Sequence, residues 1–275
     1  QAVTADAHFN KLGHEGKQLI RSIFIYNIVH PIFVIFINAF LWRQNHDIYI
    51  LILYNLASFL AIPLGYYING LLLNKFSSSH LYKLGAIAKA LTVSLLIFFS
   101  ITQYFVIVLF GLCYGLLAGI FWANRHLLTF KVTEGHNRMY FVCLDSISST
   151  ISNIILPAVV GIFIVFGITN ELYTSHFAYY MLFLFTVVIS ALSGLPLKTV
   201  ATKPSRVSHI LLRHTTPHWI QTRLVIFIFG LLSGILAFLP ILMILTFLGK
   251  ENTLGAIQSL SAIIAAIIMY WIVGR

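Results

Sequence analysis

Long apolar runs separated by short polar segments make up most of the chain. The hydrocarbon core of a bilayer needs about 20 apolar residues per helix, and eight runs reach that length. They lie near residues 20–42, 48–73, 80–102, 104–128, 140–166, 177–197, 222–248 and 253–274. Helices satisfy their own backbone groups in lipid, and the alternating pattern of a membrane barrel is absent. The pattern predicts an all-α membrane protein, a polytopic helical bundle.

The polar connections predict how the runs are grouped. Most are short, and the longest covers residues 198–221, which are rich in lysine and arginine. We therefore expect a six-helix transmembrane bundle over residues 1–197 and a basic cytoplasmic linker over residues 198–221. The first two helices of a second bundle are expected over residues 222–275.

The composition supports a membrane protein and excludes several other classes. Hydrophobic residues make up 59% of the 275 residues and charged residues only 9%, whereas charged residues are about a quarter of a soluble domain. The mean hydropathy is +0.93. A disordered chain, a nucleic-acid-binding domain and an ordinary soluble enzyme are therefore excluded.

The positive charge predicts an orientation in the membrane. If the N-terminus is cytoplasmic, 15 of the 17 basic residues lie in inner segments or at inner helix ends, and only Arg43 and Lys250 lie outside. Cytoplasmic loops are enriched in lysine and arginine. We expect a multi-pass protein of a bacterial inner membrane with a cytoplasmic N-terminus, whose net charge of +10 reports topology and not nucleic-acid binding.

Polar residues inside the runs are candidates for a binding cavity, because they are costly in lipid. In the first run Asn27, His30 and Asn38 share an arc of about 80° at 100° per residue. Pro31 removes a backbone donor and permits a kink there. The second run carries a similar polar stripe that begins at Asn55. These stripes line a shared, partly hydrated cavity or join the helices by hydrogen bonds, and both interpretations remain open.

Two opposite charges are predicted to meet inside the membrane. Arg125 and Asp145 lie about 8 Å and about 9 Å to the same side of the midpoints of two successive, antiparallel runs. An ion pair between them would offset two large desolvation costs. It is either a fixed structural pair or a gate that opens as the protein changes state. Asn124, Ser149 and Asn153 lie near this pair and are further candidates for the cavity wall.

Other residues are expected to be structural. Gly111, Gly115 and Gly119 repeat every four positions, which favours close packing against a second helix. Lys89 is expected to reach the cytoplasmic surface through its flexible side chain. The two cysteines, at positions 113 and 143, lie in apolar runs and are expected to be buried thiols.

The sequence does not favour an enzyme. It contains no metalloprotease, serine hydrolase or nucleotide-binding motif and no pair of carboxylates. The 11 histidines have no metal-ligand spacing. We therefore expect neither a metal nor a cofactor.

Six runs, a basic linker and further runs resemble the layout of the major facilitator superfamily. The segment that starts at Gly70 resembles the superfamily's cytoplasmic motif, Gly-x-x-x-Asp-Arg/Lys-x-Gly. Gly70 and Lys75 match, whereas Asn74 replaces the usual aspartate and Ser77 the usual glycine. The charge network of that motif therefore lacks its carboxylate.

The fifth run adds to the resemblance. Pro157 and Gly161 are similar to the proline and last glycine of the superfamily's Gly-Pro-x-x-Gly-Gly motif, and residues 124–161 are similar to poorly characterised bacterial members. Members usually have twelve spans in two bundles, so this chain is expected to lack the last four. The resemblance implies alternating access, with a substrate cavity between the bundles.

These observations predict a secondary transporter that moves a small solute with a proton or ion gradient. Asp145 is the first candidate for coupling, with Arg125 as its partner. Two alternatives remain. One is a non-transporting or degenerate membrane subunit, and the other is a lipid-directed membrane enzyme that uses Arg125, His126 and Asp145.

Overall fold

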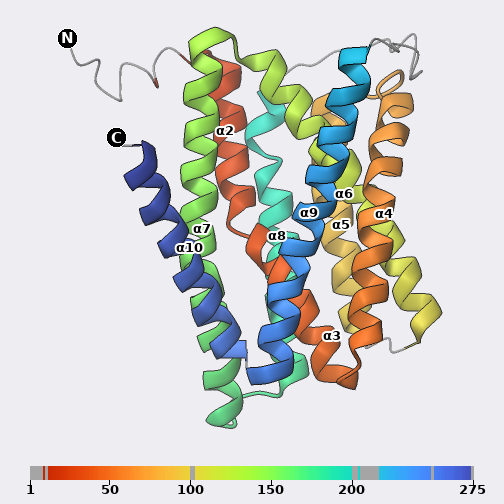
Figure 1. Ribbon diagram of the computed structural model, residues 1–275, viewed down its shortest axis with the longest axis vertical. Coiled ribbons are helices and arrows are strands. Elements are labelled where there is room, and N and C mark those ends of the chain that lie inside the picture. Colours follow the sequence, from red (N-terminus) through yellow and green to blue (C-terminus); the bar gives the residue numbers. More distant parts are fainter. Residues whose placement is uncertain are drawn as a thin grey trace.

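The computed structural model describes residues 9, 12–99, 103–199, 204, 217–248 and 251–273. Within these ranges the regular structure is helical, with no strand (Figure 1). The helices are α2 (His14–Asn27), η1 (Ile32–Phe36), α3 (Ile37–Asn45), α4 (Ile48–Leu72), α5 (Ser78–Phe98), α6 (Tyr104–Val132), α7 (Gly135–Thr169), α8 (Ser175–Ser193), η2 (Pro196–Thr199), α9 (Pro217–Leu248) and α10 (Glu251–Val273).

Helices occupy all eight predicted runs, so the chain is an all-α, polytopic membrane protein. Six described segments are long and apolar enough to cross a bilayer, namely His14–Gln44, Ile48–Leu72, Ser78–Phe98, Tyr104–Val132, Asn137–Thr169 and Ser175–Ser193. The helices α9 and α10 coincide with the seventh and eighth predicted runs. Most of the predicted linker, residues 198–221, lies outside the described residues.

The first span is broken in its middle, as Pro31 predicts. The α-helix α2 ends at Asn27, and the π-helix η1 begins at Ile32. Pro31 has no N–H with which to bond the carbonyl of Asn27. The backbone N–H groups of residues 29 and 32 instead bond the carbonyls of Tyr26 and Val29, at 3.0 and 3.1 Å. The break therefore falls directly after Asn27.

Glycine allows α4 and α6 to lie in backbone contact. A Cβ atom at Gly115 would lie 2.1 Å from the carbonyl oxygen of Ser58, and one at Gly119 would lie 2.3 Å from that of Ile62. On the facing helix, a Cβ at Gly65 would lie 2.3 Å from the carbonyl oxygen of Leu116. Only glycine fits such an approach, so the predicted packing role of the glycine ladder is confirmed.

The exposed cysteines correct one expectation. Cys113 and Cys143 are both exposed on the bundle surface and are not buried thiols. Because Gly111 and Gly115 direct one face of α6 toward α4, Cys113 lies about 200° from Gly111 around the helix and points outward. An apolar neighbourhood in the sequence did not distinguish the lipid-facing surface from the interior.

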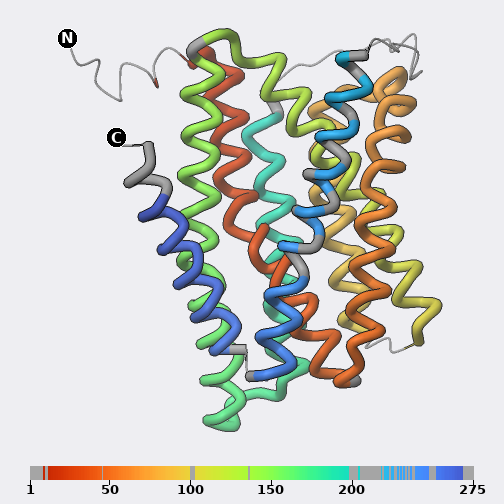
Figure 2. The backbone as a smooth tube through the Cα atoms, viewed as in Figure 1, coloured from red at the N-terminus to blue at the C-terminus, as the bar shows by residue number. Residues whose placement is uncertain are grey.

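The helices α9 and α10 pack along one side of the first six spans (Figure 2). α10 lies against α7, and α9 contacts α3, α4 and α10. At the closest point a Cβ on Gly255 of α10 would lie 2.1 Å from the carbonyl oxygen of Pro157. The backbone N–H of Ala158 donates to the hydroxyl of Ser259 at 3.1 Å. Pro157 therefore marks a tight seam between α7 and α10.

The glycine contact between α4 and α6 yields a stability prediction. Gly115→Ala forces the two backbones apart and is expected to cost about 1–3 kcal/mol, the usual range for overpacking. The matched control is Gly230→Ala on α9, where an added Cβ meets nothing within 4 Å. The control is expected to keep or raise the thermal midpoint of the purified protein, and Gly115→Ala to lower it. Equal midpoints for both variants would contradict the close packing.

Candidate functional site

The predicted ion pair between Arg125 and Asp145 is present. Nη2 of Arg125, on α6, lies 2.6 Å from Oδ1 of Asp145, on α7, and the two side chains are 6% and 26% exposed. The guanidinium also lies over the ring of Trp122, with Cζ 4.8 Å from the ring centroid. The guanidinium of Arg125 is therefore buried, whereas the carboxylate of Asp145 is partly exposed.

Asn27 joins this pair to the first span. Its amide nitrogen donates to Oδ1 of Asp145 at 3.1 Å and to the hydroxyl of Ser148 at 3.2 Å. Its carbonyl oxygen accepts from both terminal nitrogens of Arg125 at 3.4 Å. Since Asn27 is the last residue of α2, the break before η1 and the ion pair are directly connected.

Lys89 is buried, so the expectation that it reaches the surface is wrong. It is 1% exposed and donates a hydrogen bond to the hydroxyl of Tyr26. Its Nζ lies 4.0 Å from the ring centroid of Phe121 and 4.4 Å from that of Tyr26, with Phe33 and Trp122 at 5.4 and 5.9 Å. This aromatic cage encloses the ammonium group on several sides and attracts it electrostatically.

The position of Lys89 in its helix explains the error. α5 begins at Ser78, so Lys89 lies about 16 Å along the helix, too deep for its side chain to reach the surface. Tyr82, Ala86 and Val93 share its face and are buried. This i, i+3, i+4 pattern is a sequence signal that assigns Lys89 to the interior.

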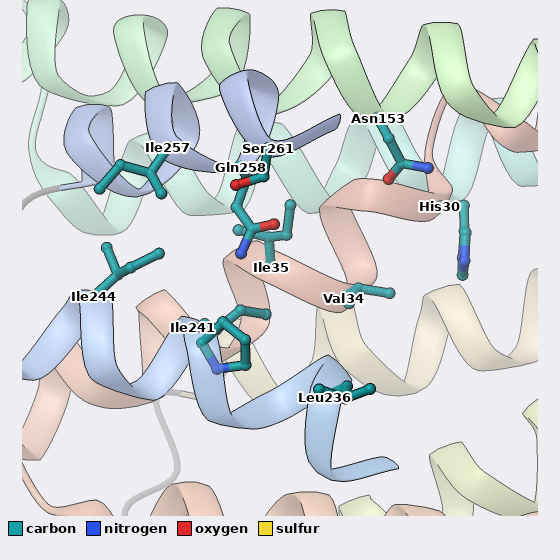
Figure 3. A pocket seen from close by; sticks show the side chains of 11 residues that line it. His30, Val34, Ile35, Asn153, Leu236, Ile241, Ile244, Ile257, Gln258 and Ser261 are labelled. Carbon is teal, nitrogen blue, oxygen red and sulfur yellow. The ribbon is translucent and has the colours of Figure 1, made fainter. Parts of the chain in front are cut away.

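A cavity of about 350 Å³ lies between the first span, α7, α9 and α10 (Figure 3). His30, Asn153, Gln258 and Ser261 are its polar lining residues. The apolar lining consists of Val34, Ile35, Leu236, Pro240, Ile241, Ile244 and Ile257. The Nδ1 atom of His30 is buried and has no hydrogen-bond partner. We call this space the central cavity.

The sequence predicted two of the four polar residues of the central cavity, His30 and Asn153. Asn153 donates to the hydroxyl of Ser149, one turn away, at 3.4 Å, and Ser149 itself does not line the cavity. Gln258 and Ser261 were missed, although their spacing of three places them on one face of α10.

The remaining candidate residues join helices and do not line the cavity. Asn55 donates to Oδ1 of Asn38 at 2.7 Å, and Asn38 donates to the carbonyl of Val34 at 3.0 Å. Asn124 donates to Oδ1 of Asn69 at 2.5 Å. For these residues the structure favours helix-joining hydrogen bonds over a hydrated wall.

The loop motif lies away from this region, at the end of α4. Gly70 is in the last turn of α4, and Asn74 and Lys75 are exposed in the turn that follows. Ser77, where the motif has glycine, caps α5 by accepting a bond from the N–H of His80 at 3.3 Å.

Histidine, cysteine and carboxylate side chains do not gather into a metal site anywhere in the described part of the chain. The fold and the buried charges thus define a multi-pass helical membrane protein with a central cavity.

Comparison with known proteins identifies relatives that are themselves uncharacterized. No protein-family model matches the chain. It is 26% identical over 238 residues to the uncharacterized protein YqgE of Bacillus subtilis (strain 168), a match that covers 86% of this chain and 55% of the relative. It is 30% identical over 127 residues to an uncharacterized protein in the sodM 3′ region of Geobacillus stearothermophilus, covering 46% and 59%. The chain spans little more than half the length of the relatives it matches.

The ion pair yields a double-mutant prediction. Asp145→Asn leaves the arginine buried without its counter-charge and is expected to cost about 3 kcal/mol. Arg125→Gln combined with Asp145→Asn removes both charges and is expected to be more stable than the single variant. Thermal midpoints of the four proteins of the cycle, measured in one detergent, give the coupling. Additive effects would contradict an energetically coupled pair.

Proposed function

We propose that the protein is a secondary active transporter that moves a small solute by alternating access. The observation that carries the proposal is the central cavity, which lies between the first span and α7 on one side and α9 and α10 on the other. Cavities of about 300–1,000 Å³ suit small-molecule ligands. In transporters such a cavity lies between two groups of helices that move against each other.

The broken and closely packed helices support this movement. Pro31 lies at the break in the first span, whereas Pro157 and Pro240 lie inside α7 and α9, which continue through them. Proline within a spanning helix is tolerated where neighbouring groups satisfy the freed backbone. The seam between Pro157 and Gly255 then serves as a pivot between the first six helices and the last two.

The ion pair is proposed to couple transport to a proton gradient. The carboxylate of Asp145 is the more exposed partner, so it is the group that a proton reaches. Its protonation would weaken the bond to Arg125 and release α7 from α6. We further propose that the protein resides in a bacterial inner membrane with a cytoplasmic N-terminus and belongs to the major facilitator superfamily.

The match covers 55% of the length of the Bacillus subtilis protein. The two-bundle organisation of this chain, with a boundary in residues 198–221, rests on the sequence and is part of the proposal.

Alternating access predicts that the cavity can be labelled from either side of the membrane. Cys113→Ser and Cys143→Ser, together with replacement of any cysteine outside these 275 residues, provide a cysteine-free background, on which Gln258→Cys places a thiol in the cavity. In right-side-out and inside-out vesicles that contain the natural full-length protein, a membrane-impermeant maleimide is expected to label it. Leu260→Cys is the control, because that side chain is 57% exposed and does not line the cavity. Labelling from one side only would contradict the proposal.

Coupling predicts that the same labelling depends on pH through Asp145. The ratio of labelling from the two sides is expected to shift between neutral and acidic medium. Asp145→Asn should remove the shift, because its amide cannot take up the proton. Glu134→Gln, at the exposed start of α7, is the control and should retain it. A shift that persists in Asp145→Asn would assign coupling to another residue, and so would gradient-driven transport by that variant.

A further inference from the structure

The buried charges of the bundle do not balance. Lys89 and Arg125 are 1% and 5% exposed. Among the acidic side chains that the structure describes, only Asp145 lies inside the bundle, and it is paired with Arg125. The contacts of the Lys89 ammonium are aromatic rings and the hydroxyl of Tyr26. An unneutralised cation in a low-dielectric interior is costly. We therefore expect Lys89 to have a function that offsets this cost.

Trp122 connects both cations to the central cavity. Its ring centroid lies 5.9 Å from Nζ of Lys89 and 4.8 Å from Cζ of Arg125. The ring also lies 5.5 Å from the imidazole of His30, which lines the cavity. Tyr26 makes a second connection, since it contacts both His30 and Lys89. The positive charge is therefore one layer of side chains behind the cavity wall.

The lining of the cavity agrees with a ligand that has one polar end. His30, Asn153, Gln258 and Ser261 offer hydrogen-bond donors, and the lining residues that the structure describes include no carboxylate. The described lining from α9 is apolar, from Leu236 to Ile244. In Figure 3 the side chains of His30 and Asn153 lie at one end of the cavity, and those of Ile244 and Ile257 lie at the other.

We propose that the central cavity binds a small molecule with one anionic group on an apolar body, and that Lys89 supplies the attraction for the anion. The imidazole of His30 and the amide of Asn153 contact the anionic group, whereas α9 contacts the apolar body. Lys89 acts through space and stays within its aromatic cage. This inference rests on the proposed function and names the class of its substrate.

Other ligand classes fit the observations less well. A cationic solute would approach two buried cations and only one carboxylate. A sugar would leave its hydroxyl groups unpaired against the apolar residues of α9, which is costly. An anionic group instead completes the charge balance, and its attraction to Lys89 is strong because the interior screens charges poorly.

Size-matched probes of different charge test the inference. Benzoate, benzamide and benzylamine share one apolar body, and their dissociation constants are measured by thermal-shift titration of the natural full-length protein in lipid nanodiscs. Benzoate is expected to bind at least about tenfold more tightly than the other two, a factor that corresponds to about 1.4 kcal/mol. Benzenesulfonate and phenylphosphonate distinguish a preference for carboxylates from one for other anions.

Variants of two lysines on one helix separate recognition from stability. Lys89→Met places a thioether in the aromatic cage, a favourable contact, and should reduce the affinity for benzoate to that for benzamide. Lys83→Met removes the same charge from the half-buried first turns of α5 and should leave the preference intact. The comparison of the probes on the wild-type protein stands even if a variant fails to fold.

The outcomes are distinct. Equal affinities for benzoate and benzamide, a preference for benzylamine, binding of none of the probes, or an unchanged preference in Lys89→Met would each overturn anion recognition. The two-sided labelling of Gln258→Cys uses no ligand. A transporter for uncharged solutes would therefore keep that labelling and lose only the preference for benzoate.

Discussion

The cost of holding charge inside a bilayer is the constraint on which the interior depends. Arg125 can occupy α6 only because Asp145 on α7 lies 2.6 Å away and Asn27 on α2 bonds both partners. Each of these three side chains comes from a different span, so the charge pair fixes the depth and rotation of three helices together. Moving any one of the helices leaves a charge or an amide unpaired in lipid, where no water replaces the lost partner.

The first span serves both the charge network and the central cavity. Asn27 joins the ion pair, and His30, three residues further on, lines the cavity. In a continuous α-helix these two side chains would lie about 60° apart, on one face. In the structure α2 ends at Asn27 and the π-helix η1 begins at Ile32, so both residues lie at the break in the span.

The aromatic cage around Lys89 is a second way in which the bundle stabilises a charge inside the bilayer. Arg125 is neutralised by a carboxylate, whereas Lys89 is held by the faces of Tyr26 and Phe121 and by the hydroxyl of Tyr26. Ring faces attract a cation without neutralising it, and in the proposed recognition its field extends into the neighbouring cavity. The central region thus combines a compensated and an uncompensated cation, and the proposed substrate class follows from that difference.

The helices and the ion pair could be predicted from the sequence alone, whereas the packing of the helices against one another sets which side chains face the cavity. The spans follow from a local property, the length of an apolar run against the thickness of a bilayer. Arg125 and Asp145 were predictable because the helices that carry them are consecutive and antiparallel, so depth alone brings the charges together. The role of Asn124 was not predictable, since its partner Asn69 lies on α4 and the pairing depends on how two helices that are not consecutive rotate against each other. That rotation is set by backbone contacts such as Gly115 against Ser58 and Gly255 against Pro157, which a helical periodicity cannot specify.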